Sequence, residues 1–447
     1  MRCRVCWLLA LLSFGFAQNW EVEAVVGSAG LGAVAVDSAC LPRMTFCAGR
    51  SMGYATKNGP VWEIEHFDTS LGSVFSQAEL CLDSNDVPRI AYVLLGWPEP
   101  SELRYALRDS ETWRVDTVVG GAPPGSLTLG ALALARDGTP HVLFVDSGVV
   151  KYAHKSGDTW SVVSVPATQT DTLRLFGSAS LALDAGDRPG VAVSWWKSGV
   201  PRDSLWLSVF EYDGQDWQRQ DVDSTEGWAP WDFWPVRVRY DPASDLFHVV
   251  YRAYRYAVGK GEDWQVDWTG SMAGNVFCDF VLHQGRPHIA SASPRDPLTY
   301  QWRSAGEWEQ ELVVDEAAPN VSIAVDHDGR PHVAFAPAGG ETLFYARRLF
   351  IGVGEPPARV QAETRFSICP NPALRAFTVE YEVPRGASTS ITLTDASGRT
   401  VLSQEASVDA GHSRYRIALP ASVRPGVYFC TFDDGCCRTS RKVVLTD

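Results

Sequence analysis

The sequence predicts an all-β fold built from repeated four-stranded units, and two observations carry this prediction. Tryptophans recur at intervals of 42 to 57 residues, and most of them follow a tyrosine by eight residues. Each interval also contains alternating apolar runs separated by turns rich in Asp, Gly and Pro, which is the pattern of short strands. Four-stranded units of this length are typical of a β-propeller. The repeated tryptophans are Trp20, Trp62, Trp113, Trp160, Trp217, Trp264 and Trp308.

Each unit supplies strands a, b, c and d in chain order, with the tyrosine on strand c and the tryptophan opening strand d. In the fourth unit, Val209 stands where the others carry tyrosine. The seventh unit ends its c strand at Tyr345 without a d strand, whereas Trp20 opens a strand that has no partner before it. Docking this N-terminal strand on the last unit would close the ring and remove an exposed sheet edge. The sequence therefore predicts a seven-bladed β-propeller over residues 18–351, or six blades if two units merge.

The first 17 residues have the pattern of a secretory signal peptide. Arg2 and Arg4 precede an apolar run over residues 5–16, and small residues stand just before Gln18. No later stretch approaches the roughly 20 apolar residues that a transmembrane helix needs. We therefore expect a protein that is exported to the periplasm and has no membrane-spanning segment.

Charge and histidine placement exclude several partners. The net charge of −14 argues against nucleic acid, because nucleic-acid binding needs basic surface. His141, His288 and His332 occur once per unit, point to different places around a ring and cannot converge on a metal. The acidic turns at 83–86 and 326–329 offer two or three oxygens, fewer than calcium takes, and are interpreted as turn residues. We therefore expect no cofactor and no metal.

The cysteines predict disulfides, because the chain is exported and no CxxC pair is present. We expect Cys40 to pair with Cys47 across a hairpin. In the C-terminal part, we expect Cys430 to pair with Cys436 or Cys437. The candidates for buried thiols are Cys81 and Cys278.

The turns between strands c and d, such as KNGPVW, SGDTW and YDGQDW, resemble a shortened Asp-box, the hairpin repeat of sialidase-like propellers. This resemblance implies the fold. A sialidase also needs an arginine cluster for the substrate carboxylate, and the Phe-Arg-Ile-Pro motif that such families carry near the first blade is absent from this sequence. The resemblance therefore does not extend to sialidase catalysis.

The loops from d to a and from b to c emerge on one face of such a propeller, and they are the variable ones, so a ligand site is expected there. Tryptophans outside the repeat fall in these loops beside charged residues. Flat aromatic rings beside Asp, Glu and Arg suit sugars, whose apolar ring faces stack while hydroxyls meet charged groups. The candidate ligand-binding residues are Trp97, Trp195, Trp196, Arg202, Asp203, Trp228, Trp231, Asp232 and Trp234.

Three other interpretations of this face stay open. The tryptophans could pack the loops, since aromatic residues are usually buried first. Asp203 with Glu226 or Asp232 could serve a glycoside hydrolase or lyase, which needs two carboxylates at a defined separation. The propeller could also be a purely structural surface protein. No nucleophile elbow, Walker loop or HExxH motif is present. We therefore expect binding of a glycan or protein ligand rather than catalysis.

Residues 352–363 break the repeat and are predicted to be a linker. Residues 364–447 show six or seven alternating apolar runs with glycine turns, the pattern of a small immunoglobulin-like β-sandwich. Five spaced motifs here closely resemble the type A sorting domain of the type IX secretion system. The resemblance implies an address read by the secretion machinery, and a destination outside the cell or on the outer-membrane surface. The matching residues are Asn371, Pro372, Asp395, Gly398, Arg399, Gly411, His412, Gly426, Val427, Tyr428 and Lys442.

Overall fold

The structure is a computed structural model of the 447-residue chain. It describes residues 19–27, 29–48, 50–59, 61–69, 73–109, 112–166, 173–197, 204–226, 235–251, 255–269, 277–293, 296–304, 306–318, 320–337, 342–349, 366–369, 371, 373–383, 387–395, 399–408, 411–420, 423–433 and 438–446. The chain divides into two compact units, Met1–Val353 and Gly354–Asp447. Every regular element within these described ranges is a β-strand, as the sequence predicts.

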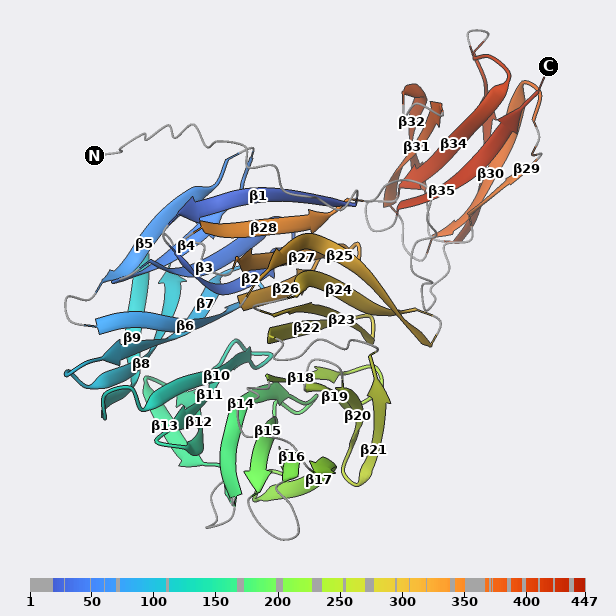
Figure 1. Cartoon of the computed structure of the whole chain (residues 1–447). Coiled ribbons are helices and arrows are strands. Elements are labelled where there is room, and N and C mark those ends of the chain that lie inside the picture. The colour runs from blue at the N-terminus through green and yellow to red at the C-terminus, as the bar shows by residue number, and fades with distance from the viewer. Residues whose placement is uncertain are drawn as a thin grey trace, which may run out of the picture. The chain divides into compact units, whose positions relative to one another are not determined.

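The first unit contains seven four-stranded antiparallel sheets, which we number as blades in chain order (Figure 1). Blade one consists of β2 (Gly30–Val36), β3 (Pro42–Ala48), β4 (Ser51–Thr56) and β5 (Glu63–Thr69). Blade two consists of β6 (Ser73–Leu82), β7 (Pro88–Gly96), β8 (Ser101–Asp109) and β9 (Thr112–Ala122). Blade three consists of β10 (Leu127–Leu134), β11 (Pro140–Asp146), β12 (Val149–Ser156) and β13 (Thr159–Ser164). Blades four and five consist of β14 (Leu173–Leu183), β15 (Pro189–Lys197), β16 (Ser204–Tyr212) and β17 (Trp217–Glu226); and β18 (Val236–Asp241), β19 (Leu246–Tyr251), β20 (Arg255–Lys260) and β21 (Asp263–Trp268). Blades six and seven consist of β22 (Phe277–His283), β23 (Arg286–Ala292), β24 (Pro297–Ser304) and β25 (Glu307–Ala317); and β26 (Asn320–Val325), β27 (Pro331–Ala336), β28 (Thr342–Arg348) and β1 (Trp20–Gly27).

The first strand of each blade lies at the centre of the ring. Each of these strands contacts its counterpart in the next blade, and β26 of the last blade contacts β2 of the first. The blades therefore form a closed β-propeller, and the count of seven predicted from the tryptophan repeat is confirmed.

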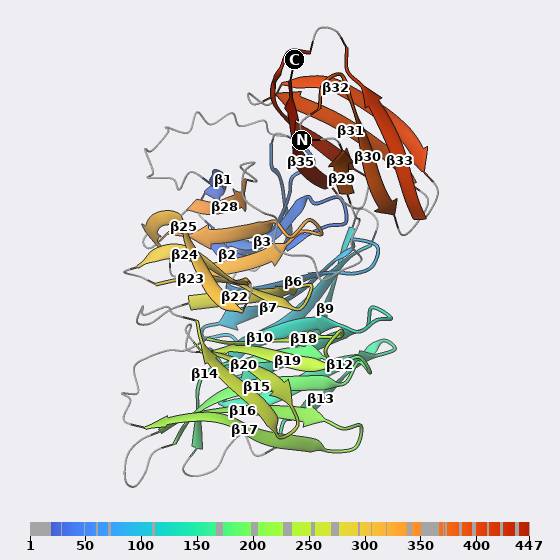
Figure 2. The ribbon, with the colours of Figure 1, turned by 90° about the vertical axis from the view of Figure 1, so that its right-hand side faces the viewer.

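The N-terminal strand completes the last blade, as predicted. β1 pairs with β28 antiparallel from Trp20 opposite Arg348 to Gly27 opposite Thr342, and the two strands lie side by side in Figures 1 and 2. The indole N–H of Trp20 also donates to a carboxylate oxygen of Glu311 in blade six, at 3.0 Å. The two ends of the propeller sequence are thereby joined in one sheet, and this sheet is tied to its neighbour.

Each repeated tryptophan lies against the preceding blade. Six of them meet a c-strand tyrosine of that blade edge-to-face, with ring centroids 5.3–5.9 Å apart. At the seventh junction, Trp264 packs in a cluster that contains Val209. The six pairs are Tyr54–Trp113, Tyr105–Trp160, Tyr152–Trp217, Tyr256–Trp308, Tyr300–Trp20 and Tyr345–Trp62.

Buried histidines on the b strands bind these tyrosines. His141, His288 and His332 each lie 2.5 Å, Nδ1 to hydroxyl, from the tyrosine of their own blade, and His248 makes the same contact. Burial lowers the pKa of His141 to about 4 and that of His288 to about 3. These histidines are therefore neutral structural residues, one per blade, and do not converge.

The acidic residues of the a–b turns fold the turn itself. In the first, second, fourth and seventh blades, one carboxylate oxygen of the aspartate that opens the turn accepts backbone N–H groups two and four residues later. The other oxygen accepts from a cationic or imidazole side chain, such as Arg43 on Asp37 or Arg89 on Asp83. Since donors fill these oxygens, the aspartates serve the turn.

The predicted Cys40–Cys47 disulfide is wrong. Cys40 lies in the turn before β3 with its Sγ against His327, whereas Cys47 lies near the far end of β3 with its Sγ against Met52. A strand rises about 3.3 Å per residue, so these positions lie roughly 20 Å apart, beyond the reach of a disulfide. No hairpin separates the two cysteines, because Cys40 precedes the single strand β3 and Cys47 lies near its end.

The other cysteine predictions are also corrected or refined. Cys430 is a free, buried cysteine on β34, so its predicted disulfide is wrong, and Cys436 and Cys437 lie outside the described residues. Cys81 keeps its thiol, which donates to the carbonyl of Leu132 at 3.4 Å. Cys278 is 3% exposed on β22.

The C-terminal unit consists of two antiparallel sheets. One contains β29 (Phe366–Cys369), β30 (Ala376–Val383) and β33 (Gly411–Ala418); the other contains β32 (Thr400–Val408), β31 (Ala387–Asp395), β34 (Gly426–Asp433) and β35 (Arg438–Leu445). Phe377 and Ile417 of the first sheet pack in one core with Ile391 and Leu393 of the second. The alternation read from the sequence is confirmed, since the inward positions of both sheets form this core.

We expect Trp113→Ala to destabilise the propeller strongly. The Trp113 indole stacks on Phe67 at 4.2 Å and meets Tyr54 edge-to-face, so its removal leaves a cavity between two blades. The expected loss is about 3–5 kcal/mol, measured by urea unfolding. Trp97→Ala is the matched control: its indole is 79% exposed, so the change should stay within about 0.5 kcal/mol. Equal effects of the two substitutions would contradict an inter-blade role.

We expect His288 to make stability depend on pH. Its folded pKa is near 3 because it is buried, whereas an unfolded histidine titrates near 6.5. Between these values the unfolded chain binds a proton that the folded chain excludes, so stability is full above about pH 6.5 and falls with pH by up to about 1.4 kcal/mol per unit. His288→Gln should therefore make the fall between pH 7 and 4.5 shallower in urea titrations. An unchanged slope would show that His288 does not contribute.

Candidate functional site

Three of the nine candidate ligand-binding residues lie in the described part of the chain. They are Trp97, in the loop between β7 and β8, and Trp195 and Trp196, near the end of β15. Trp97 thus lies in a b–c loop, and Trp195 and Trp196 lie where a b strand ends beside such a loop. Both places are on the face where a site was expected. The other candidates lie outside the described residues: Arg202, Asp203, Trp228, Trp231, Asp232 and Trp234.

Trp195 is a core residue. Its side chain is 0% exposed, lies 6.0 Å from the Phe210 ring and belongs to the cluster between blades three and four. Packing, the alternative interpretation, therefore holds for Trp195, which offers no surface to a ligand. Trp196 is half-buried, and the structure does not bring it together with Trp97, since the two lie on blades four and two.

Trp97 is exposed on a braced loop. Its side chain is 79% exposed, and the loop folds back so closely that a Cβ on Gly96 would lie 2.1 Å from the carbonyl oxygen of Glu99. The buried hydroxyl of Ser101 accepts the backbone N–H of Gly96 at 3.3 Å and that of Gly125 at 2.9 Å. The indole therefore projects from a loop that is tied both to its own blade and to the next connection.

Polar groups occupy the same end of this hairpin. Glu102 lies opposite Leu94 where β7 and β8 meet their connecting loop, and its carboxylate accepts a hydrogen bond from Arg104 at 2.8 Å. Arg104 also donates to Asp68 at 2.7 Å, and the Tyr92 hydroxyl donates to the same carboxylate at 2.7 Å. These side chains place carboxylate and guanidinium groups at the junction of blades one and two.

Trp268 is an exposed aromatic residue that the sequence analysis missed. It ends β21, where the d–a connection begins, is 47% exposed, and lies under the Arg255 guanidinium at 5.1 Å. The signal was the second tryptophan of GEDWQVDW, four residues after the repeated one. It lies on the same face as Trp97 but three blades away.

A cavity of about 270 Å³ opens between blades four and five on the opposite face. This junction lacks the tyrosine of the repeat, and Gly190 stands where other blades carry histidine or arginine; a Cβ there would lie 2.5 Å from the Phe247 ring. The charged groups around the cavity already have partners, since Lys260 binds Asp245 and Glu211 binds the Gly261 N–H.

Charged side chains also line the centre of the ring. Arg237 of β18 lies 3.9 Å from Glu79 of β6 and 3.5 Å from Asp279 of β22, and Arg239 lies 3.3 Å from Asp279. Burial raises the pKa of Glu79, while Arg237 opposes that rise. The cluster contains two cationic and two acidic groups, so it holds blades two, five and six together with no excess charge.

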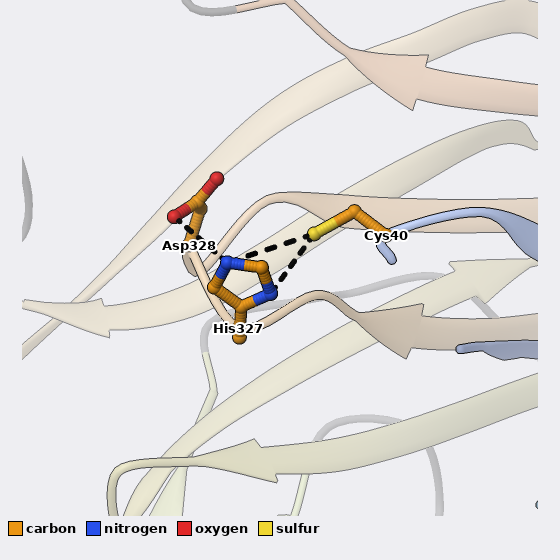
Figure 3. Close-up of side chains that lie close together, drawn as sticks. All are labelled: Cys40, His327 and Asp328. Carbon is orange, nitrogen blue, oxygen red and sulfur yellow. Dashed lines mark hydrogen bonds and ion pairs between the residues drawn. The ribbon is translucent and has the colours of Figure 1, made fainter. Parts of the chain in front are cut away.

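One group of side chains in the described ranges has the composition of a metal site. Cys40 of the first a–b turn lies beside His327 and Asp328 of the seventh, and their ligand atoms all lie within 4.8 Å of one another (Figure 3). The Cys40 Sγ is 3.0 Å from Nδ1 and 3.9 Å from Nε2 of His327, and that Nε2 is 3.5 Å from Oδ1 of Asp328. The three residues come from the first and last blades.

The sequence motifs of the C-terminal unit form its turns and edges. Asn371 bridges to β35: its amide donates to the Lys442 carbonyl at 2.7 Å and its oxygen accepts the Val444 N–H at 2.9 Å. Asp395 accepts the backbone N–H of Arg399 at 3.1 Å, which closes the turn before β32.

The later motifs position β33 and β34. The Tyr428 hydroxyl donates to the Arg424 carbonyl at 2.8 Å while its ring is 7% exposed, and the preceding Val427 is 40% exposed. Gly426 begins β34, and Gly411 and His412 begin β33. Pro372 and Gly398 lie outside the described residues.

These motifs identify the class of the C-terminal unit. Residues 367–446 match the family model of the secretion system C-terminal sorting domain. The chain thus carries a type IX sorting domain behind a β-propeller passenger, and it is secreted to the cell surface or the extracellular space. The machinery that reads the domain is the partner of this unit. Within the described ranges, no helix has the length and apolarity to cross a membrane.

Several solved structures are similar to this chain at low identity. The Aleuria aurantia lectin in complex with Fucalpha1-6GlcNAc is 13% identical, with a TM-score of 0.41, covering 63% of this chain and 96% of that one. The Penicillium chrysogenum alpha-L-arabinanase with arabinobiose is 11% identical, with a TM-score of 0.45, covering 74% and 100%. PorZ, a surface component of the type IX secretion system of Porphyromonas gingivalis, is 11% identical, with a TM-score of 0.33, covering 98% and 53%.

No curated protein sequence matches the chain. Each of these three TM-scores is below 0.5, so the fold assignment rests on the strand pairing and ring contacts described above.

We expect deletion of residues 366–446 to stop transport across the outer membrane. The propeller closes on itself through β1 and β28, so the shortened chain should fold and accumulate in the periplasm. Cell fractionation of a type IX-competent bacterium expressing both forms would measure this. The control is the full chain carrying Trp97→Ala, which should be exported normally. Surface display of the deleted form at the level of the full chain would contradict the sorting role.

Proposed function

We propose that the propeller binds a glycan on the face formed by its b–c and d–a loops, with Trp97 as the stacking platform. The observation that carries this proposal is an indole that is 79% exposed on a braced loop. A packing role explains Trp195 but not Trp97, which contributes little to the core.

The physical argument rests on stacking and on preorganisation. The flat apolar face of a sugar ring fits an indole, and its hydroxyls bind well to charged acceptors and donors. Glu102, whose side chain is 32% exposed, presents a carboxylate on the same hairpin, and Arg104 orients it. Because Gly96 and Ser101 already fix the loop, binding requires little loss of loop entropy.

The remaining candidates of this face belong to the same proposal. Trp196, Arg202, Asp203, Trp228, Trp231, Asp232 and Trp234 would extend the surface around the ring. The finer relations, a sialidase-like propeller and an immunoglobulin-like sorting domain, are likewise proposed on the turn and strand patterns of the sequence.

We expect Trp97→Ala to weaken glycan binding by about tenfold or more, because central aromatic residues dominate such contacts. A glycan array would first find ligands for the purified full chain, and titration of the strongest one would compare the variants. Stability should not change, since the indole is exposed.

Trp268→Ala is the matched control, because Trp268 is also exposed on this face but belongs to blade five. It should retain the affinity for a glycan bound at Trp97. Equal affinity of wild type and Trp97→Ala would overturn the proposed platform. Cleavage of the bound glycan would instead assign an enzyme, and binding to a protein without any glycan would assign a protein ligand.

A further inference from the structure

The a–b turns of neighbouring blades touch one another through a repeated contact. Asp86 is the fourth residue of the turn in blade two, and Ser38 is the second residue of the turn in blade one. The backbone N–H and the hydroxyl of Ser38 both donate hydrogen bonds to the Asp86 carboxylate. In blade four, Asp187 makes the same contact to Arg136 of blade three, at 3.2 Å. The contact therefore links a fixed pair of turn positions across a junction.

At the junction between the last blade and the first, this contact has a different chemistry. Its fourth residue is Cys40 and its second residue is His327, followed by Asp328. Cys40 has a φ of 60°, which is a left-handed conformation. At the corresponding turn position of other blades, Asp86, Asp187 or a glycine adopts this conformation. Cysteine has no conformational advantage in this conformation, whereas Asp and Gly tolerate it. Backbone preference therefore does not explain why a cysteine occupies this position.

We propose that Cys40, His327 and Asp328 bind Zn²⁺, with water as the fourth ligand. In a tetrahedral zinc site, a thiolate sulfur and an imidazole nitrogen lie about 3.6 Å apart, and an imidazole nitrogen and a carboxylate oxygen about 3.3 Å. The observed separations are 3.9 Å from Sγ to Nε2 of His327 and 3.5 Å from that Nε2 to Oδ1 of Asp328. Sγ lies nearer Nδ1, at 3.0 Å, so the His327 ring must rotate to direct its Nε2 lone pair at an ion between Sγ and Oδ1.

The surrounding charge favours a divalent cation. Asp326 and Asp328 make the electrostatic potential at Cys40 negative. This potential attracts Zn²⁺, which binds the thiolate and releases the thiol proton to solvent. Asp326 itself is occupied, since it accepts from His332 at 3.2 Å and from the turn backbone. Asp328 is the carboxylate left to bind the ion.

The ion would connect the first and last blades. Cys40 precedes β3, and His327 and Asp328 precede β27, so coordination ties the two ends of the repeat on the face opposite the proposed glycan site. This differs from the proposed function, because it concerns the stability of the ring and not ligand recognition. It also protects an accessible thiol in a protein that is exported to an oxidising environment.

Cobalt titration of the reduced, metal-free full chain tests the proposal. Co²⁺ replaces Zn²⁺ in tetrahedral sites and gives visible bands together with thiolate charge-transfer absorption. We expect one equivalent to bind, Zn²⁺ to displace it, and Zn²⁺ to raise the melting temperature. Cys40→Ser and His327→Ala should each weaken binding by about 100-fold or more, because each is one of three protein ligands. Asp328→Asn should weaken it by about tenfold.

Two controls separate the site from general effects. Cys81→Ser removes a different thiol, and Asp187→Ala removes the equivalent turn contact between blades three and four; both should leave cobalt binding unchanged. The proposal is overturned if wild type binds no Co²⁺ or Zn²⁺ at micromolar concentration, or if Cys40→Ser binds as well as wild type. Binding without a rise in melting temperature would overturn the connection of the two blades.

Discussion

The contact between a d-strand tryptophan and the c-strand tyrosine of the preceding blade is the interaction on which the propeller depends. Six such pairs surround the ring with nearly constant geometry. Each packs two large rings between sheets and sets the spacing of neighbouring blades. In four of them the tyrosine hydroxyl also contacts a b-strand histidine, which is His141, His248, His288 or His332. The Tyr300–Trp20 pair continues this geometry across blades six and seven, so docking of β1 completes the same pattern that joins the other blades.

Because this contact is periodic, it could be predicted from the sequence. A tryptophan that must meet the previous blade recurs at blade length, and its tyrosine recurs at a fixed distance within the hairpin. Features that depend on position along a strand could not be predicted as well. Cys40 and Cys47 were expected to face each other across a hairpin but lie at opposite ends of the single strand β3. Trp195 and Trp97 have the same side chain but exposures of 0% and 79%. Residue type does not determine which of these a ligand can reach.

Contacts between segments that are distant along the chain could not be predicted from the sequence either. Cys40 and His327 are separated by 287 residues, and they meet because the ring brings its first and last turns together. The motif of the turn was visible, yet the pairing of its fourth residue with the second residue of the preceding turn requires the closed structure. Once this pairing is known, the variable side chains at one position become comparable: a hydrogen bond at Ser38, an ion pair at Arg136, and a thiol–imidazole pair at His327.

The junction of blades four and five shows how far the repeat can change. Val209 replaces the tyrosine, and Gly190 replaces the histidine or arginine. The contact between these two side chains therefore has no counterpart in blade four. Phe247 replaces the proline that opens the other b strands, and its ring lies over Gly190 so closely that a Cβ there would collide with it. The aromatic ring thus comes from the following blade instead of the same one, and the core of this junction remains buried. The ring therefore requires an apolar filling at each junction more strictly than it requires the tyrosine itself.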